Sequence, residues 1–96
     1  MLENKYKTDL VKRIENTWVG SIVIRVDPTF IQGFPDLLVL YNDRWAALEV
    51  KKSSKEPHRP NQDDYVELTN QMGFGAFIFP ENEDDVLAQL DDYFFG

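Results

Sequence analysis

The chain contains no cysteine and only one histidine, His58, among its 96 residues. The absence of cysteine excludes disulfide bonds and metals held by thiolates, such as structural zinc. A metal bound by these residues would have to be held by oxygen atoms or by the single imidazole. Oxygen ligands favour hard ions, so the composition points to Mg²⁺ or Mn²⁺ rather than to a softer metal.

A long apolar run is also lacking. No stretch approaches the roughly 18 apolar residues of a membrane span, and the first residues, MLENKYKTDLVKRIEN, lack the apolar core of a signal peptide. We therefore expect a cytoplasmic protein. Because 43% of the residues are hydrophobic, the chain has enough bulk for one small core, and we expect residues 1–96 to form a single domain.

Basic residues are absent from the last part of the sequence. Residues 81–96 hold six acids and no base, whereas the first 80 residues hold ten bases against eleven acids. The formal charge of −7 therefore arises mostly at the C-terminal end. The bases gather in two segments, Lys5 to Arg13 and Lys51 to Arg59, which suit contacts with phosphates but also suit ordinary solvated surfaces.

The spacing of apolar residues and turn signals predicts a mixed α/β fold. Helices are expected at residues 2–18, 61–72 and 83–94, and strands at 21–26, 36–41, 45–51 and 74–80. The first three strands should form an antiparallel meander. The fourth follows a helix, so it should pair with the third in parallel.

Finer expectations concern burial. The continuously apolar strand 36–41 is typical of a central strand covered on both faces. Phe30 and Ile31 are expected to anchor the preceding turn-rich loop to the core. On helix 61–72 the apolar side holds Tyr65, Leu68 and Met72, and Gly73 is expected to cap the helix.

The predicted hairpin brings charged residues together. A two-residue turn at 42–43 would set Asp36 opposite Glu49, and a turn one residue longer or shorter would set it opposite Val50. In either register the two acids are neighbours. Side chains alternate along a strand, so Glu49 and Lys51 point to the same face, roughly 7 Å apart.

Two neighbouring carboxylates repel each other unless one is protonated or a cation neutralises both. Mg²⁺ commonly binds through one or two protein carboxylates together with phosphate oxygens, and it can activate a water and polarise a phosphodiester. Lys51 would then orient the attacking water or neutralise charge on the phosphate. The alternative is a structural ion-pair cluster of Asp36, Glu49 and Lys51 at the end of a sheet.

These residues resemble a known signature. Pro35-Asp36, twelve residues, and then Glu49-Val50-Lys51 resembles the PD-(D/E)xK nuclease motif. The segment RPNQ places Gln62 where Holliday junction resolvases and the virus-type replication-repair nuclease domain (VRR-NUC) have a glutamine. The stretches GFPD and ALEVKK are similar to the small stand-alone VRR-NUC pattern, and the likeness covers about residues 2–80.

The resemblance implies a restriction-endonuclease-like αβββαβ core with a mixed four-stranded sheet, followed here by a C-terminal helix. It implies a homodimeric, Mg²⁺- or Mn²⁺-dependent nuclease that hydrolyses DNA, preferring branched DNA such as Holliday junctions. One alternative is a non-catalytic module of the same fold that binds nucleic acid or another protein. Another is a small inhibitor whose acidity mimics DNA, although the charge is then expected on one whole face.

The resemblance also implies residue roles. Asp36 and Glu49 would be metal ligands with the main-chain carbonyl of Val50, Lys51 would be the catalytic lysine, and Gln62 would support the site or touch phosphate. Glu3 would assist metal binding, although an acid is also common at the start of a helix, where it favours the positive end.

Residues after the motif are candidates for DNA contacts. Lys52, Lys55 and Arg59 follow the site directly in the chain and are expected to hold the DNA backbone, or else to form a solvated loop. His58 in the same loop is expected to be a surface residue or a phosphate contact; the other interpretation is a general base.

Overall fold

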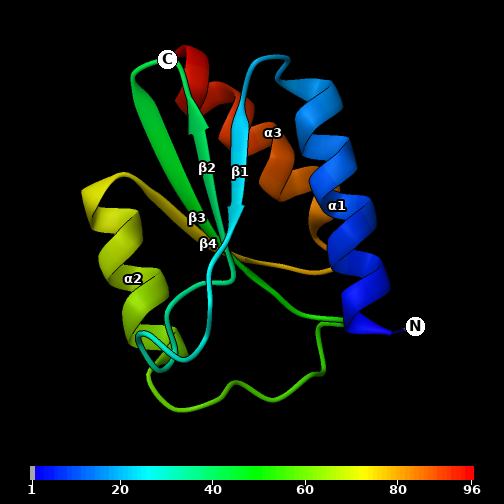
Figure 1. The fold of residues 1–96 in the computed structure, drawn as a ribbon, viewed down its shortest axis with the longest axis vertical. Coiled ribbons are helices and arrows are strands. Elements are labelled where there is room, and N and C mark those ends of the chain that lie inside the picture. Colours follow the sequence, from blue (N-terminus) through cyan, green and yellow to red (C-terminus); the bar gives the residue numbers. More distant parts are fainter. Residues whose placement is uncertain (1) are drawn as a thin grey trace.

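The structure is a computed structural model that describes residues 2–96. Within them the elements follow the predicted order, with boundaries shifted by one or two residues in places (Figure 1). They are α1 (Glu3–Thr17), β1 (Ile22–Arg25), β2 (Leu37–Tyr41), β3 (Arg44–Val50), α2 (Gln62–Met72), β4 (Phe74–Ile78) and α3 (Glu83–Phe95).

The strands of residues 2–96 form one mixed sheet in the order β1-β2-β3-β4. β1 pairs with β2 and β2 with β3 in antiparallel fashion, whereas β3 and β4 are parallel. The predicted meander and parallel pair are therefore confirmed. The crossover from β3 to β4 runs through α2, as a parallel connection requires.

The main core lies between one face of the sheet and the helices α1 and α3. On this face alternate residues of β2 and β3 point inward. Trp18 at the end of α1 packs edge-on against Phe94 of α3, with ring centroids 5.3 Å apart. The buried cluster contains Tyr6, Leu10, Ile14, Trp18, Leu37, Val39, Ala46, Leu48, Val50, Phe74, Ile78, Val86, Leu87, Leu90 and Phe94. From α3 this core receives Val86, Leu87, Leu90 and Phe94, so the helix turns its apolar side to the sheet.

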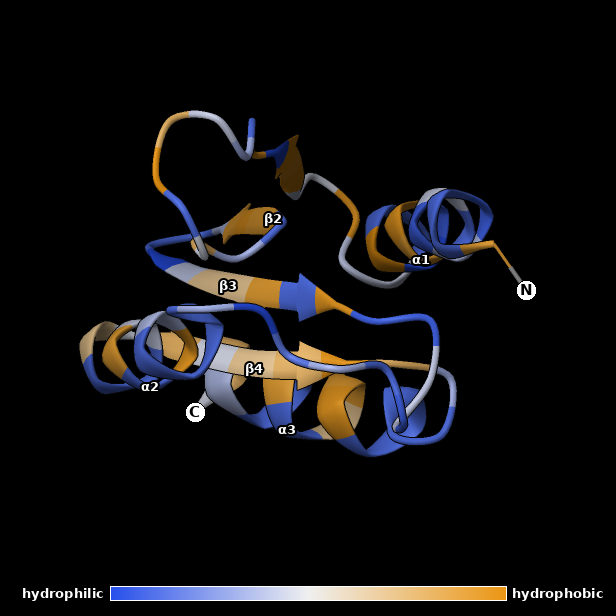
Figure 2. Cartoon of the chain, turned by 90° about the horizontal axis from the view of Figure 1, so that it is seen from below, coloured by the Kyte–Doolittle hydropathy of each residue, from blue (hydrophilic) through white to orange (hydrophobic). Residues whose placement is uncertain are grey.

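The helix α2 lies on the other side of the sheet from α1, over β3 and β4 (Figure 2). Its buried residues are Gln62 and Thr69, whereas Leu68 and Met72 are 44% and 71% exposed. The side of α2 that is buried against the sheet is therefore the side of Gln62 and Thr69, not the apolar side that carries Leu68 and Met72. The cause is close packing on β4: a Cβ added at Gly75 would lie 2.2 Å from the Thr69 hydroxyl oxygen, so the glycine admits this face of the helix.

Because α2 covers β3 and β4, the same side of β1 and β2 has no helix over it. Ile22, Ile24 and Leu40 are 60%, 43% and 39% exposed, and Leu38 is half-buried. We call these four residues the open sheet face. The expectation that residues 36–41 are covered on both faces is therefore wrong for the face that carries Leu38 and Leu40. On the opposite face Leu37 and Val39 are fully buried, as expected.

The loop before β2 also differs from the expectation. Phe30 and Ile31 are 81% and 45% exposed, so they do not anchor the loop to the core. The loop is held instead by polar and aromatic contacts away from its tip. The Asp27 carboxylate accepts hydrogen bonds from the Thr29 N–H and hydroxyl, and the Phe34 ring packs edge-on against Tyr65 at 5.7 Å.

Among residues 2–96, no helix combines the length and the apolar character that crossing a membrane requires.

Candidate active site

The hairpin of β2 and β3 sets the register of the site. Tyr41 pairs with Arg44 around a two-residue turn, and Leu37 pairs with Leu48. The turn residue Asn42 has φ 54°, the left-handed conformation that such a short hairpin turn favours. Continuing this register by one residue places Asp36 opposite Glu49, which is the first of the two registers that the sequence allowed.

Asp36 lies where the loop enters β2, and its carboxylate is held from two sides. The Val50 N–H donates to Oδ2 at 2.9 Å, and the Lys7 ammonium of α1 lies 3.4 Å from Oδ1. The first contact fixes the side chain on the backbone of β3. The second leaves its charge partly neutralised by a cation at the mouth of the site.

Glu49 is the most constrained of the acids. Its side chain is 3% exposed, Oε2 accepts a hydrogen bond from the Gln62 amide at 3.1 Å, and Oε1 has no partner among residues 2–96. Burial raises the pKa of Glu49 to about 8, and the negative charge of the neighbouring Asp36 raises it further. Two neighbouring carboxylates repel each other, so the pair needs either a proton or a cation.

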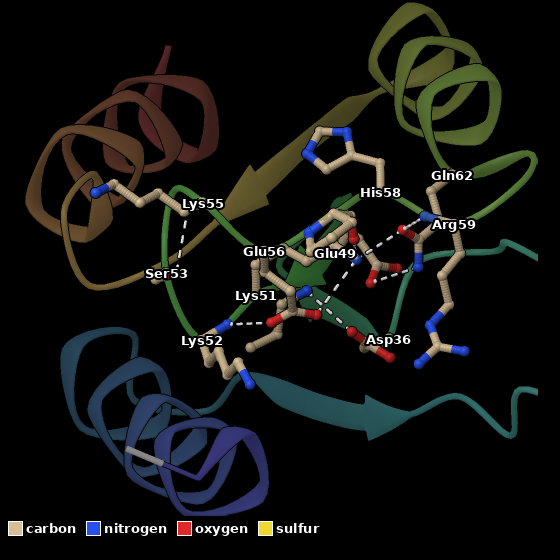
Figure 3. A network of polar contacts seen from close by, with 12 residues as sticks. Asp36, Glu49, Lys51, Lys52, Ser53, Lys55, Glu56, His58, Arg59 and Gln62 are labelled. Carbon is tan, nitrogen blue, oxygen red and sulfur yellow. Dashed lines mark hydrogen bonds and ion pairs between the residues drawn. The ribbon is translucent and has the colours of Figure 1, made fainter.

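Gln62, the first residue of α2, joins the acid to the lysine. Its Nε2 donates to Glu49, while its Oε1 accepts from the Lys51 ammonium and from the Arg59 N–H, both at 2.7 Å (Figure 3). These contacts fix the orientation of the amide, because each end meets only groups of the opposite hydrogen-bonding type. Gln62 therefore positions Glu49 and Lys51 relative to each other.

Lys51 is buried, with 2% of its surface exposed. Besides Gln62, its ammonium donates to the Pro57 carbonyl at 3.2 Å and lies 3.5 Å from Oε2 of Glu56. A buried ammonium is tolerated only when it is paired and hydrogen-bonded in this way. The predicted shared face of Glu49 and Lys51 is confirmed, because both side chains line the same cavity.

Glu56 is a residue of the site that the sequence analysis missed. Its Oε1 accepts from the Lys52 N–H at 2.7 Å. Burial and a hydrogen bond with Glu56 raise the pKa of Glu3. Burial alone would raise the pKa of Glu56. The hydrogen bond from the Lys52 N–H and the contacts with Glu3 and Lys51 outweigh burial and lower this pKa. In the sequence Glu56 is only a single acid five residues after Lys51, in a loop that is otherwise basic.

The charged residues surround a cavity of about 810 Å³ at the end of the sheet. The structure brings five predicted site residues together there, Glu3 from α1, Asp36, Glu49, Lys51 and Gln62. The remaining lining residues are Leu2, Lys7, Pro28, Lys52, Glu56, Pro57 and Arg59.

Two of the three predicted DNA-contact residues, Lys52 and Arg59, lie at this cavity. Lys55 does not line it in the described part of the chain, and in Figure 3 its side chain lies apart from the cluster of Asp36 and Glu49.

His58 is held outside the cavity. Its Nδ1 lies 2.6 Å from the Asp63 carboxylate of α2, and its ring stacks on Phe77 of β4 with centroids 4.0 Å apart. In the part of the chain that the structure describes, His58 lines neither this cavity nor the smaller hollow beside it. This placement agrees with the interpretation of His58 as a surface residue rather than as a general base.

The donor set fits a hard cation. Residues 2–96 contain no cluster of three His, Cys, Asp or Glu side chains placed to hold a metal. Asp36 and Glu49 nevertheless supply two carboxylates, and Mg²⁺ usually binds through one or two. The unpartnered, buried Oε1 of Glu49 is an oxygen that lacks a donor and would accept a cation. A third ligand from the Val50 carbonyl stays a prediction.

The raised pKa of Glu49 predicts a pH dependence of stability in metal-free protein. The folded state retains the proton that the unfolded state loses, so the free energy of unfolding should decrease as pH rises from about 4.5 to about 8. Urea denaturation in EDTA across this range measures the decrease. Asp27 and Glu81, whose pKa values are lowered by hydrogen bonds to Thr29 and Ser54, contribute below this range instead.

The matched control for this prediction is Glu49→Gln, which keeps the shape and cannot ionise. Its stability should change less with pH than that of the wild type between these limits, because the shifted titration has been removed. Equal slopes in the two proteins would show that Glu49 is not held protonated by its surroundings.

Comparison with solved structures identifies two with this fold. A structure described as a VRR_NUC domain has a TM-score of 0.70 and 24% sequence identity over 95% of this chain and 96% of that chain. A VRR_NUC domain protein has a TM-score of 0.67 and 16% identity over 97% of this chain and 88% of that chain. No family model matches the sequence, and no curated protein matches it. The chain therefore has the VRR_NUC fold, and the predicted restriction-endonuclease-like architecture is confirmed.

Proposed function

We propose that this chain is a metal-dependent nuclease that hydrolyses DNA phosphodiester bonds, with a preference for branched DNA. The observation that carries the proposal is the pair of Asp36 and Glu49 in one cavity with Lys51, with a buried Glu49 oxygen that no group of residues 2–96 satisfies. A purely structural ion-pair cluster would be expected to pair that oxygen, because an unpaired buried polar atom is costly.

In this proposal Asp36, Glu49 and the Val50 carbonyl hold Mg²⁺ or Mn²⁺, and Glu3 assists from α1. The ion would polarise the phosphodiester and lower the pKa of a water molecule. The Val50 N–H orients the Asp36 carboxylate before any metal binds, and the Gln62 amide orients Glu49 in the same way. The protein thus supplies preorganised oxygens, which reduces the cost of assembling the site on binding.

Lys51 supplies positive charge next to the reacting phosphate. Its ammonium is held by Gln62 and by the Pro57 carbonyl, so its position is fixed before substrate arrives. A fixed cation stabilises the negative charge that develops on a phosphate during attack, and it does so without reorganisation. Lys52 and Arg59 at the mouth of the cavity, with Lys55 outside it, would bind neighbouring phosphates of the DNA backbone.

The proposal is tested by cleavage of a panel of single-stranded, duplex, flapped and four-way DNA with Mg²⁺, Mn²⁺ or EDTA. Cleavage that depends on the metal, and that is faster on branched than on linear duplex DNA, supports the proposal. Binding of DNA without cleavage under every metal condition would instead support a non-catalytic module of the same fold.

We further propose a homodimer, and the open sheet face supports it. Ile22, Ile24, Leu38 and Leu40 form an apolar surface on a sheet, and the exposed Leu68 and Met72 belong to the helix on the same side. Exposed apolar surfaces of this kind mark interfaces. Asp36 precedes Leu38 by two residues and so lies on the same side of the chain, and a two-fold axis through this surface would bring two sites together and leave the acidic α3 on the far side.

Charged substitutions in this surface should separate the dimer. Ile22→Glu combined with Met72→Glu is expected to weaken dimerisation by at least about 30-fold, because a carboxylate would be desolvated at the interface. Phe95→Glu, an exposed residue of α3 on the other side of the sheet, is the control and should leave the assembly unchanged. Sedimentation velocity at micromolar concentration measures the result, and a wild-type monomer would contradict the proposal.

A further inference from the structure

A second, smaller hollow adjoins the main cavity. Its volume is about 260 Å³, and it shares Asp36, Glu49, Arg59, Gln62 and Pro28 with the main cavity. The residues that line only the smaller hollow are Gln32, Gly33, Phe34 and Pro60. The hollow therefore extends the candidate active site on the side of the loop that precedes β2.

This loop forms a local turn on one side of its tip and packs against residues 60–61 on the other side. On one side, the Phe30 N–H donates to the Asp27 carbonyl at 3.3 Å, in addition to the contacts of the Asp27 carboxylate with Thr29. On the other side, Gly33 has φ 87°, and a Cβ added there would lie 2.7 Å from the Pro60 carbonyl oxygen. Only glycine allows this conformation and this close approach to residues 60–61. The loop therefore forms one side of the hollow.

The tip of this loop carries an exposed aromatic ring. Phe30 lies in the sequence between Pro28 and Gln32, which both line the smaller hollow, and it is 81% exposed. The sequence predicted that this ring packs on the core, and it does not. An exposed aromatic ring between two residues that line the hollow has a surface available for a flat ligand.

We propose that Phe30 stacks on an unpaired nucleobase next to the phosphate bound at Asp36 and Glu49. This inference rests on the proposed nuclease function and names a determinant of its substrate preference. The charges fit this occupant, because Arg59 lines both hollows and would meet the phosphate of the same strand. Every base has an aromatic face, so the contact recognises an unpaired strand without reading its sequence.

The same contact disfavours intact duplex. In a duplex each base is already stacked on its neighbours, and inserting a side chain between them costs unstacking energy. At a flap or branch point a base is free to turn toward the protein. Phe30 would thus favour branched DNA over linear duplex by binding, before any chemical step.

The test uses a flapped DNA with 2-aminopurine in the single strand next to the branch, and Ca²⁺ in place of Mg²⁺. Phe30→Ala should bind this DNA about 5- to 150-fold more weakly than the wild type, the range for loss of one base–aromatic stack. Phe30→Trp should retain the affinity. The wild type should change the 2-aminopurine fluorescence on binding, and Phe30→Ala should not. Phe95→Ala, another exposed phenylalanine, should behave as the wild type.

The outcomes separate this inference from the proposed function. Wild-type binding with an equal affinity and fluorescence change in Phe30→Ala overturns the stacking role alone. Sedimentation shows whether Phe30→Ala is still a dimer. If this variant loses affinity and is found to be dissociated, the stacking role is also overturned, because the ring would then contact a second copy of the chain. A wild type that binds no DNA overturns the inference together with the nuclease proposal.

Discussion

Lys51→Met is expected to reduce DNA cleavage by at least about 100-fold, the lower end of the effect of removing one preorganised group that stabilises transition-state charge. Methionine fills much of the buried volume of the lysine and removes only the charge, which alanine would not do. The affinity for DNA should change far less, because the lysine acts mainly on the transition state. Single-turnover cleavage and a binding titration separate the two effects.

The matched control is Lys52→Met, the neighbouring lysine at the mouth of the cavity. It should weaken DNA binding, with a smaller dependence on salt, and leave the single-turnover rate at saturating protein nearly as in the wild type. Thermal unfolding of both variants verifies that they fold. A folded Lys51→Met protein that cuts at the wild-type rate would exclude the role proposed for Lys51.

Asp36→Asn and Glu49→Gln should each weaken Mn²⁺ binding by more than about 100-fold, since even residues that only support metal ligands contribute 10- to 100-fold. Both changes keep the shape and remove the charge. Glu49→Gln is also expected to leave the metal-free protein at least as stable as the wild type at pH 8, because a buried carboxylate has been removed. Calorimetry and paramagnetic broadening by Mn²⁺ measure the binding.

Asp63→Asn is the control for the metal site, because Asp63 pairs with His58 outside the cavity. It should bind Mn²⁺ as the wild type does. If Asp36→Asn and Glu49→Gln also bind Mn²⁺ normally, the two carboxylates are not its ligands, and the cavity must be explained as a structural cluster.

The register of the site could be predicted from the sequence because it depends on local rules. The two-residue turn at 42–43 and the alternation of a strand place Asp36 opposite Glu49 and put Lys51 on the same face as Glu49. The order of the strands followed from the same patterns and from the helical crossover.

Burial on the α2 side could not be predicted because it depends on contacts between distant segments. The approach of Thr69 to Gly75 decides which side of the helix faces the sheet, and periodicity alone favoured the more apolar side with Leu68 and Met72. Tertiary packing thus overrode the hydrophobic pattern, and it also left the open sheet face without a helix.

The loops presented the same difficulty. The sequence assigned Phe30 to the core because it is apolar, but polar contacts hold its loop and leave the ring outside. Glu56 joins the site only because the loop after β3 folds back, so that its carboxylate meets the Lys52 N–H and approaches Lys51. Neither arrangement has a signature in a short window of sequence.

The central claim is most directly tested by cleavage of one labelled four-way junction by wild type and Asp36→Asn, purified in parallel and assayed in Mg²⁺ and in EDTA. The account predicts cleavage by the wild type in Mg²⁺ only, and none by Asp36→Asn, which removes a contaminating nuclease as an explanation. Equal cleavage by both proteins, or no cleavage of the junction by a folded, Mn²⁺-binding wild type, would contradict the account.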